Sequence, residues 1–190
     1  MDFRHDAAEG EIGGSDGCIN LNEPEHNGVE GCLKKFGILE VYDKVKAKVS
    51  LADFFVIAGE AASARAATHP KELAARFRDG FKYGRKTVKH CPWNWDRMPS
   101  PEHGCFGDDS KGIKGLKHIF NDNMFRGRVD GWALTAAISG AHTVGKASLE
   151  NSGYEGHWST AAEQGKFNND YYKQIFMRGW VPELAMNGKK

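Results

Sequence analysis

The chain has 190 residues, of which 40% are hydrophobic and 27% charged, and its formal net charge is +1. This length and composition are typical of one globular domain with a hydrophobic core and exclude a disordered chain. A net charge so close to zero provides no general attraction to nucleic acid or to an anionic membrane, so neither is expected as a partner.

The hydrophobic runs are short. The longest, FFVIAG, is far below the length that spans a bilayer. The first residues, MDFRHDAAEG, are polar and lack the pattern of a secretory signal peptide. The sequence therefore predicts no membrane-spanning segment.

The first half of the chain predicts a loop followed by two helices. Residues 7–32 contain six glycines and few large apolar side chains, which is typical of a loop. Apolar residues recur at helical spacing over 36–49 and predict the first helix. The second is expected over 50–67, with Ser50 as N-cap and Asp53 three residues later. Because this segment is apolar on nearly every side, it predicts a buried helix.

The rest of the chain is also expected to be helical. Pro70 introduces a short amphipathic helix over 71–81, and the Gly, Pro and Cys content of 80–110 predicts a long ordered loop. Three more helices are expected over 111–125, 128–145 and 168–180, the last capped by Asn168 or Asn169. No segment alternates apolar and polar residues with a period of two. The predicted fold class is therefore all-α.

The four cysteines form two local pairs with the same separation and no C-x-x-C spacing, which argues against a zinc ribbon. The spacing favours two disulfides, Cys18–Cys32 and Cys91–Cys105, although two other pairings are open. Two disulfides would indicate secretion or another oxidising compartment. The alternative is a cytosolic chain with four buried free thiols.

His142 follows three small residues, Ser139, Gly140 and Ala141. Such a run lets a bulky flat partner approach the helix backbone, and Gly145 then allows the chain to turn away. A single histidine in this setting is more often a buried core residue than a ligand. The wider sequence changes this balance.

Nearly the whole chain is covered by segments in a characteristic order: RHDA…GGSDGCINL, VSLADFFVIAGEAA, FKYGRK, ISGAHTVGKA, ENSGYEGHW and FNNDYY. Together they resemble the plant-type (non-animal) haem peroxidases, most closely the cytochrome c and ascorbate peroxidase branch. The resemblance implies one two-lobed helical domain over 1–190, shortened at both ends. Its distal lobe would span about 1–110 and its proximal lobe about 111–190.

The resemblance also implies haem b and a set of site residues. The axial iron ligand would be His142, and the cofactor would lie against Gly140, Ala141 and Thr143. The distal histidine would be His5, which would move a proton between the two oxygens of hydrogen peroxide by general acid–base catalysis. The implied activity is reduction of hydrogen peroxide with one-electron oxidation of a small reductant, as in defence against oxidative stress.

Trp158 matches the tryptophan beside the proximal histidine in this branch. It would either carry an oxidising equivalent or simply pack as an aromatic wall. The resemblance also pairs Asp53 with Arg85 in a structural ion pair.

Two departures from the family pattern predict impaired activity. The family arginine that stabilises the departing peroxide oxygen lies four residues before the distal histidine, which is the position of Met1. Arg4 directly precedes His5 and on a helix would point elsewhere, so it cannot simply substitute. The aspartate that orients the proximal histidine in the family is also expected to be absent. The alternative function is therefore a non-catalytic binding or structural protein that keeps the scaffold, with or without haem.

The resemblance suggests two cation sites. Asp6 and Asp16 match distal calcium ligands, but Cys18 stands where the family has a serine ligand. A weaker proximal cation site would involve Thr143, Ser159 and Asn168, the last in place of an aspartate.

Overall fold

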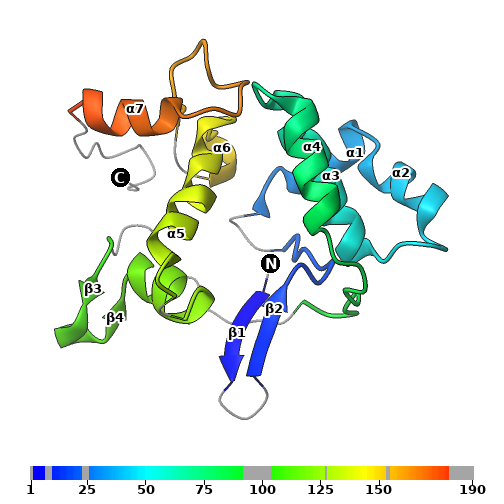
Figure 1. Cartoon of the computed structure of the whole chain (residues 1–190), viewed down its shortest axis with the longest axis horizontal. Coiled ribbons are helices and arrows are strands. Elements are labelled where there is room, and N and C mark those ends of the chain that lie inside the picture. The colour runs from blue at the N-terminus through cyan, green and yellow to red at the C-terminus, as the bar shows by residue number, and fades with distance from the viewer. Residues whose placement is uncertain are drawn as a thin grey trace. The chain divides into compact units, whose positions relative to one another are not determined.

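The computed structural model describes residues 2–6, 10–22, 26–91, 104–126, 128–152 and 155–179, with the backbone alone described for 2–6, 10–13 and 152. Most of its regular segments are helices, which confirms the predicted all-α class (Figure 1). The α-helices are α1 (Val29–Lys35), α2 (Ile38–Val45), α3 (Leu51–Ala66), α4 (Pro70–Gly80), α5 (Gly131–Ser139), α6 (Leu149–Ser152) and α7 (Asp170–Met177). Within this part of the chain, no helix combines the length and apolar character needed to cross a bilayer.

The chain divides into two compact units, each built from two stretches of sequence. The first unit comprises Met1–Gly14 and His90–Ser139, and the second comprises Ser15–Lys89 and Gly140–Lys190. The lobe boundary expected near residue 110 falls inside the first unit.

Two short hairpins accompany the helices and were not predicted. In the first, β1 (Asp2–Asp6) pairs antiparallel with β2 (Gly10–Gly14), so that His5 lies opposite Glu11. The second joins β3 (Gly107–Asp108) to β4 (Ile113–Lys114). The loop expected over 7–32 therefore includes β2 and the start of α1. Strands this short, with three glycines among the five residues of β2, carry no readable alternation.

The distal block that the resemblance implied to be helical is a strand. Arg4 and His5 lie within β1, paired with Ile12 and Glu11 of β2. The directions of the Arg4 and His5 side chains therefore cannot be compared on a helix in this segment. Glycine is a poor helix former, so the three glycines of β2 disfavour a helix in this segment.

In the second unit, the helix expected over 36–49 is shorter, since α2 covers Ile38–Val45, and a separate helix, α1, precedes it. Gly37 has φ 61°, in the left-handed region, and it separates α1 from α2. The rings of Tyr42 on α2 and Phe54 on α3 lie 5.2 Å apart, so this break lets α2 pack back onto α3.

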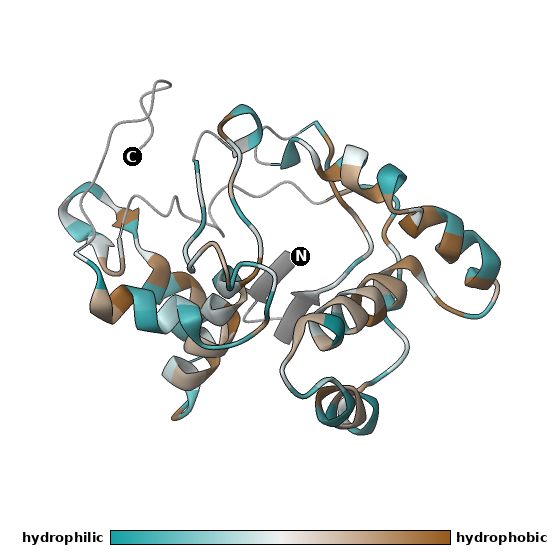
Figure 2. Ribbon diagram, turned by 90° about the horizontal axis from the view of Figure 1, so that it is seen from above, coloured by the Kyte–Doolittle hydropathy of each residue, from teal (hydrophilic) through white to brown (hydrophobic). Residues whose placement is uncertain are grey.

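Helices α3 and α4 lie side by side (Figure 1). As predicted, Ser50 caps α3, because its side chain accepts a hydrogen bond of 3.0 Å from the Asp53 N–H. Pro70 occupies the first turn of α4, also as predicted. The prediction that α3 is buried all round is only partly confirmed, since its buried residues are Ala52, Asp53, Phe54 and Ala64. Figure 2 shows hydrophilic and hydrophobic residues mixed on the helices.

The first unit contains an unusual helical segment. The helix expected over 111–125 is replaced by η4 (Asp109–Lys111), β4 and η5, a π-helix over His118–Met124. Helix η5 packs against α5. The helix expected over 128–145 is also shorter, because α5 ends at Ser139 and a 3-10 turn, η6 (Gly140–Thr143), follows in the second unit.

Both predicted disulfides are wrong. Cys18 and Cys91 are disulfide-bonded, whereas Cys32 and Cys105 are free. The backbone explains the pairing, since the Val88 N–H donates a 3.0 Å hydrogen bond to the Asp16 carbonyl and brings these two segments together. Equal spacing along the sequence could not reveal this approach.

This pairing predicts the thiol chemistry of the native chain. Two thiols, Cys32 and Cys105, are exposed and should react with iodoacetamide without reduction, and four should react after reduction. Mass spectrometry of the labelled peptides checks the count. The Cys32→Ser/Cys105→Ser variant should take up no label before reduction. Four labels on the unreduced wild-type chain would contradict the bond.

Candidate functional site

The residue predicted as the proximal histidine, His142, lies on a turn that is fixed by hydrogen bonds. His142 is the third residue of η6 and is exposed, while the next residue, Thr143, is fully buried. The Thr143 hydroxyl donates to the Asn168 carbonyl at 3.0 Å, and the Thr143 carbonyl accepts from the Ser159 hydroxyl at 2.9 Å. These bonds fix the backbone beside His142, so the imidazole projects from a turn that is held in place by hydrogen bonds.

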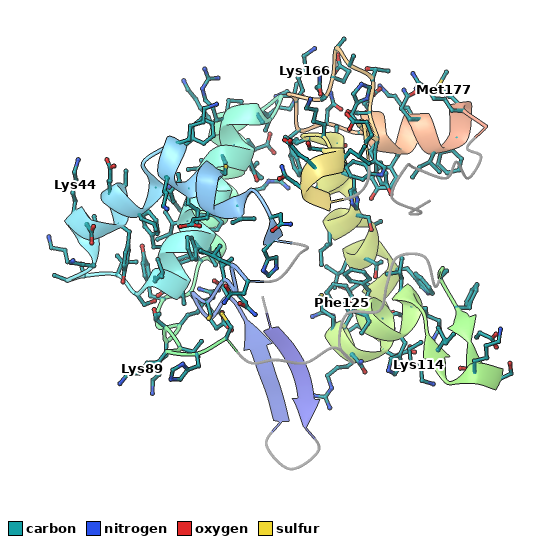
Figure 3. All side chains as sticks on the ribbon, turned by 180° about the vertical axis from the view of Figure 1, so that it is seen from behind. Lys44, Lys89, Lys114, Phe125, Lys166 and Met177 are labelled. Atoms are coloured by element: carbon teal, nitrogen blue, oxygen red, sulfur yellow. The ribbon has the colours of Figure 1, made fainter. Side chains whose placement is uncertain are left out.

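Two aromatic rings lie against His142. The ring centroid of Trp158 is 4.8 Å from that of the imidazole, and the ring centroid of Tyr171 is 5.3 Å from it. Both distances are within the range of direct ring packing. The contact with Trp158 joins two predicted site residues that lie sixteen positions apart in the sequence. Tyr171 comes from the segment between Lys166 and Met177, both labelled in Figure 3.

Tyr171 is the site residue that sequence reasoning missed. The FNNDYY block contained the pattern that could have indicated it, because two adjacent tyrosines lie in the first turn of α7. Burial raises the pKa of Tyr171, and the neighbouring Tyr172 adds to this effect. Burial also raises the pKa of Tyr172. Both phenols therefore stay neutral at physiological pH.

The small residues before His142 have different surroundings. A Cβ at Gly140 would lie 3.4 Å from the ring of Tyr172, which is ordinary van der Waals contact, so this tyrosine packs against the turn. Ala141 is exposed. Since α5 ends at Ser139, the α-helical face that the sequence analysis extended to His142 does not reach it.

The candidate proximal cation ligands are brought together, but as partners of one another. Thr143 and Ser159 share the hydrogen bonds described above, and the Asn168 amide donates to Glu163 at 2.6 Å. The Asn168 side-chain oxygen accepts from the Asp170 N–H at 2.8 Å, next to Asn169, which is the N-cap of α7 and makes no side-chain capping bond. Their polar atoms are thus engaged in an internal network. Among the described side chains, no three His, Cys, Asp or Glu residues are grouped so as to hold a metal ion.

Asp170 connects this network to the Trp158 segment. Its carboxylate accepts from the Thr160 N–H at 2.7 Å and from the Gln174 amide at 3.3 Å. The hydrogen bond from Thr160 holds the pKa of Asp170 below its usual value, despite the opposing effect of burial.

This lowered pKa predicts an acid-sensitive contribution to stability. Because the folded pKa lies below the unfolded one, the contribution is present above about pH 4 and is lost as pH falls through the folded pKa. The free energy of unfolding of Asp170→Asn should therefore be below that of wild type at pH 6, and the gap should close toward pH 2. Urea titrations at several pH values measure it. A gap that is independent of pH would contradict the assignment, and Asp43→Asn on α2 serves as the exposed control.

The distal candidates cannot be assembled in the same way. The side chains of Arg4, His5 and Asp6 lie outside the described residues, and their backbone belongs to β1. Asp16 is described, and its carboxylate accepts a 2.8 Å hydrogen bond from the Cys18 N–H. Cys18 itself is disulfide-bonded and offers no thiolate ligand.

The expected ion pair between Asp53 and Arg85 is present. Their side chains meet at 2.9 Å, and the Asp53 carboxylate also accepts from the Gly84 N–H at 2.9 Å. Burial is the largest single influence and raises the pKa of Asp53, but the hydrogen bonds from Gly84 and Arg85 together bring it below its usual value. The pair therefore ties α3 to the segment that follows α4.

A mainly helical chain that presents a histidine against a tryptophan, with the motifs in this order, has the features of the plant-type peroxidase class. A family model described as "Peroxidase" matches residues 3–182. The chain belongs to this peroxidase family.

Curated relatives support the same conclusion. The chain is 30% identical over 176 residues to "Probable L-ascorbate peroxidase 4, peroxisomal" of Oryza sativa subsp. japonica, covering 90% of this chain and 52% of the relative. It is 31% identical over 94 residues to "Cytochrome c peroxidase, mitochondrial" of Yarrowia lipolytica, covering 47% and 26%. A "Putative heme-binding peroxidase" of Mycosarcoma maydis is 32% identical over 83 residues, covering 44% and 23%.

The chain spans about half the length of the ascorbate peroxidase that it matches over most of its own length. The relatives are named as peroxisomal and mitochondrial, so they do not support the expectation of secretion. That expectation also rested on two local disulfides, which the structure does not contain.

Proposed function

We propose that this chain is a haem-dependent peroxidase that reduces hydrogen peroxide while oxidising a small reductant in one-electron steps. The observation that carries the proposal is the contact of His142 with Trp158 on the anchored η6 turn. Family membership and the heme-binding name of one relative support it. One turnover converts one peroxide, two protons and two electrons into two waters, with the electrons supplied by two reductant molecules.

The described residues fit haem on the proximal side. His142 is an exposed imidazole on a fixed backbone, which suits an axial ligand, and haem, when bound, would supply the redox chemistry at its iron. The rings of Trp158 and Tyr171 would orient His142 and exclude water from one side of it. Gly140, Ala141 and Thr143 belong to the same turn and would adjoin the cofactor.

The residues proposed to act on hydrogen peroxide are assigned from the sequence resemblance. His5 would take a proton from one peroxide oxygen and deliver it to the other. With Met1 in place of the family arginine, we expect turnover to be slower by on the order of 100-fold, comparable to loss of one oxyanion donor. Of the two candidate calcium ligands, Asp16 accepts a hydrogen bond from the Cys18 N–H through its carboxylate, and the Asp6 side chain lies outside the described residues.

The second candidate function is a non-catalytic member of the family. It is favoured by the conformation of Arg4 and His5, which lie in a β-strand where the resemblance implied a helix. Such a protein would keep the scaffold and bind haem or a partner without turnover.

Peroxide turnover by the haem-loaded full chain distinguishes the two functions. Ascorbate and reduced cytochrome c, the reductants in the names of its relatives, should each be offered with hydrogen peroxide. We expect slow oxidation that His5→Ala abolishes and that replacement of His118, a half-buried histidine of η5, by alanine leaves unchanged. A bound haem with no turnover above free haem would favour the non-catalytic function.

A further inference from the structure

The second unit contains a shallow cavity, largely open to solvent, that the proposed peroxidase function does not use. It has a volume of about 380 Å³ and is formed by α3, the end of α4 and the segment that follows α4. The residues that line it are Val56, Arg76, Phe77, Gly80, Phe81, Lys82 and Arg85. This volume is at the lower end of the range for small-molecule sites.

One wall of the cavity is aromatic. The rings of Phe77 and Phe81 lie 5.0 Å apart, and Tyr83 packs edge-on against Phe81 at 4.6 Å. These contacts hold the two phenylalanines in place although both are only half-buried. They provide an apolar surface against which a flat ring can pack.

The rest of the lining is cationic. Arg85 lies over the Phe81 ring at 5.2 Å and is held by Asp53 and by the Lys82 carbonyl, to which it donates at 2.7 Å. Arg76 pairs with Glu72 at 2.8 Å, but both side chains are exposed, so water screens this pair and holds it weakly. No carboxylate among the described residues forms an ion pair with Lys82. Three cations therefore line the cavity, and two of them have carboxylate partners, Arg76 with Glu72 and Arg85 with Asp53.

A second cavity, also bordered by α4, provides a comparison for the lining of the first. It measures about 310 Å³ and shares Arg76, but its lining includes the Glu72 carboxylate and only one phenylalanine, Phe167. A carboxylate on the wall repels an anionic ligand, so the aromatic and cationic features coincide in the first cavity.

We propose that the cavity of about 380 Å³ is a binding site for a small aromatic carboxylate. The ring of the ligand packs on Phe77 and Phe81, and its carboxylate meets Lys82 and Arg76. A purely inorganic anion leaves the aromatic wall exposed to water, and a neutral aromatic compound offers Lys82 no anionic partner. Only a ligand that carries both groups satisfies the whole lining.

Calorimetric titration of the full chain with 2-naphthoate tests this site. We expect saturable binding with a Kd on the order of 1 mM or tighter. The uncharged methyl ester lacks the carboxylate, and acetate lacks the ring, so each should bind at least about tenfold more weakly. Because no haem is needed, the result does not depend on the peroxidase function.

Gly80→Leu is the decisive variant. A Cβ at Gly80 meets nothing within 4 Å, so the helix accepts a side chain there, and leucine occupies space in the cavity. Binding of 2-naphthoate should fall at least about tenfold. Gly59→Leu on α3 is the matched control, since it is also exposed, has open space around its Cβ and does not line the cavity.

The charge is tested separately. Lys82→Gln should weaken binding several-fold, and Lys86→Gln, an exposed lysine outside the lining, should not. Thermal unfolding of each variant verifies that it is folded. The proposal is overturned if wild type shows no saturable binding, if the ester binds as tightly as the acid, or if Gly80→Leu and Gly59→Leu bind alike.

Discussion

Replacing His142 by alanine should eliminate the Soret band of the haem-loaded chain. The proposed axial ligand contributes the metal bond itself, whereas loss of an outer partner of a ligand already costs 10- to 100-fold in affinity. We therefore expect haem affinity to fall by at least about 100-fold. Titration of haem into the purified full chain, followed by absorbance near the Soret maximum, measures the effect.

Two variants make this result specific. Trp158→Phe keeps an aromatic ring beside the imidazole and should retain the Soret band, since it leaves the ligand in place. His118→Ala removes a half-buried histidine of the other unit and should bind haem like wild type. The assignment fails if His142→Ala keeps the wild-type spectrum and affinity. Thermal unfolding of the haem-free variants separates loss of the ligand from loss of the fold.

The second large effect concerns the ion pair in the haem-independent scaffold. Asp53→Ala should lower the free energy of unfolding by about 3 kcal/mol, because it leaves Arg85 and the Gly84 N–H without their acceptor. This is the lower end of the range for a broken buried pair, since the Arg85 side chain is 34% exposed and regains some hydration. Urea denaturation of the haem-free chain gives the measurement.

An exposed pair on the same unit is the matched control. Asp43 meets Lys46 at 2.9 Å, but both side chains are more than half exposed, so Asp43→Ala should change stability by less than about 0.5 kcal/mol. A double-mutant cycle with Arg85→Ala isolates the coupling of Asp53 to its partner. Equal effects of Asp53→Ala and Asp43→Ala would show that burial of the pair contributes nothing.

Local sequence determined the elements whose signals lie within a few residues. Ser50 and Asp53 predicted the start of α3, because the capping bond joins residues three apart. Pro70 likewise predicted the first turn of α4, because its fixed φ suits that position. The order of the motifs identified the family, and with it the pairing of Asp53 with Arg85 and the proximity of His142 and Trp158.

The tertiary structure decided what depends on distant partners. Gly37 adopts a left-handed backbone that separates α1 from α2, and the β1–β2 hairpin depends on pairing between strands too short to show a period. Cys18 bonds Cys91 because a backbone hydrogen bond from Val88 to Asp16 brings their segments together. The packing of Tyr171 on His142 likewise needs η6 and α7 to meet. Sequence spacing measures separation along the chain, and only the folded chain converts it into distance in space.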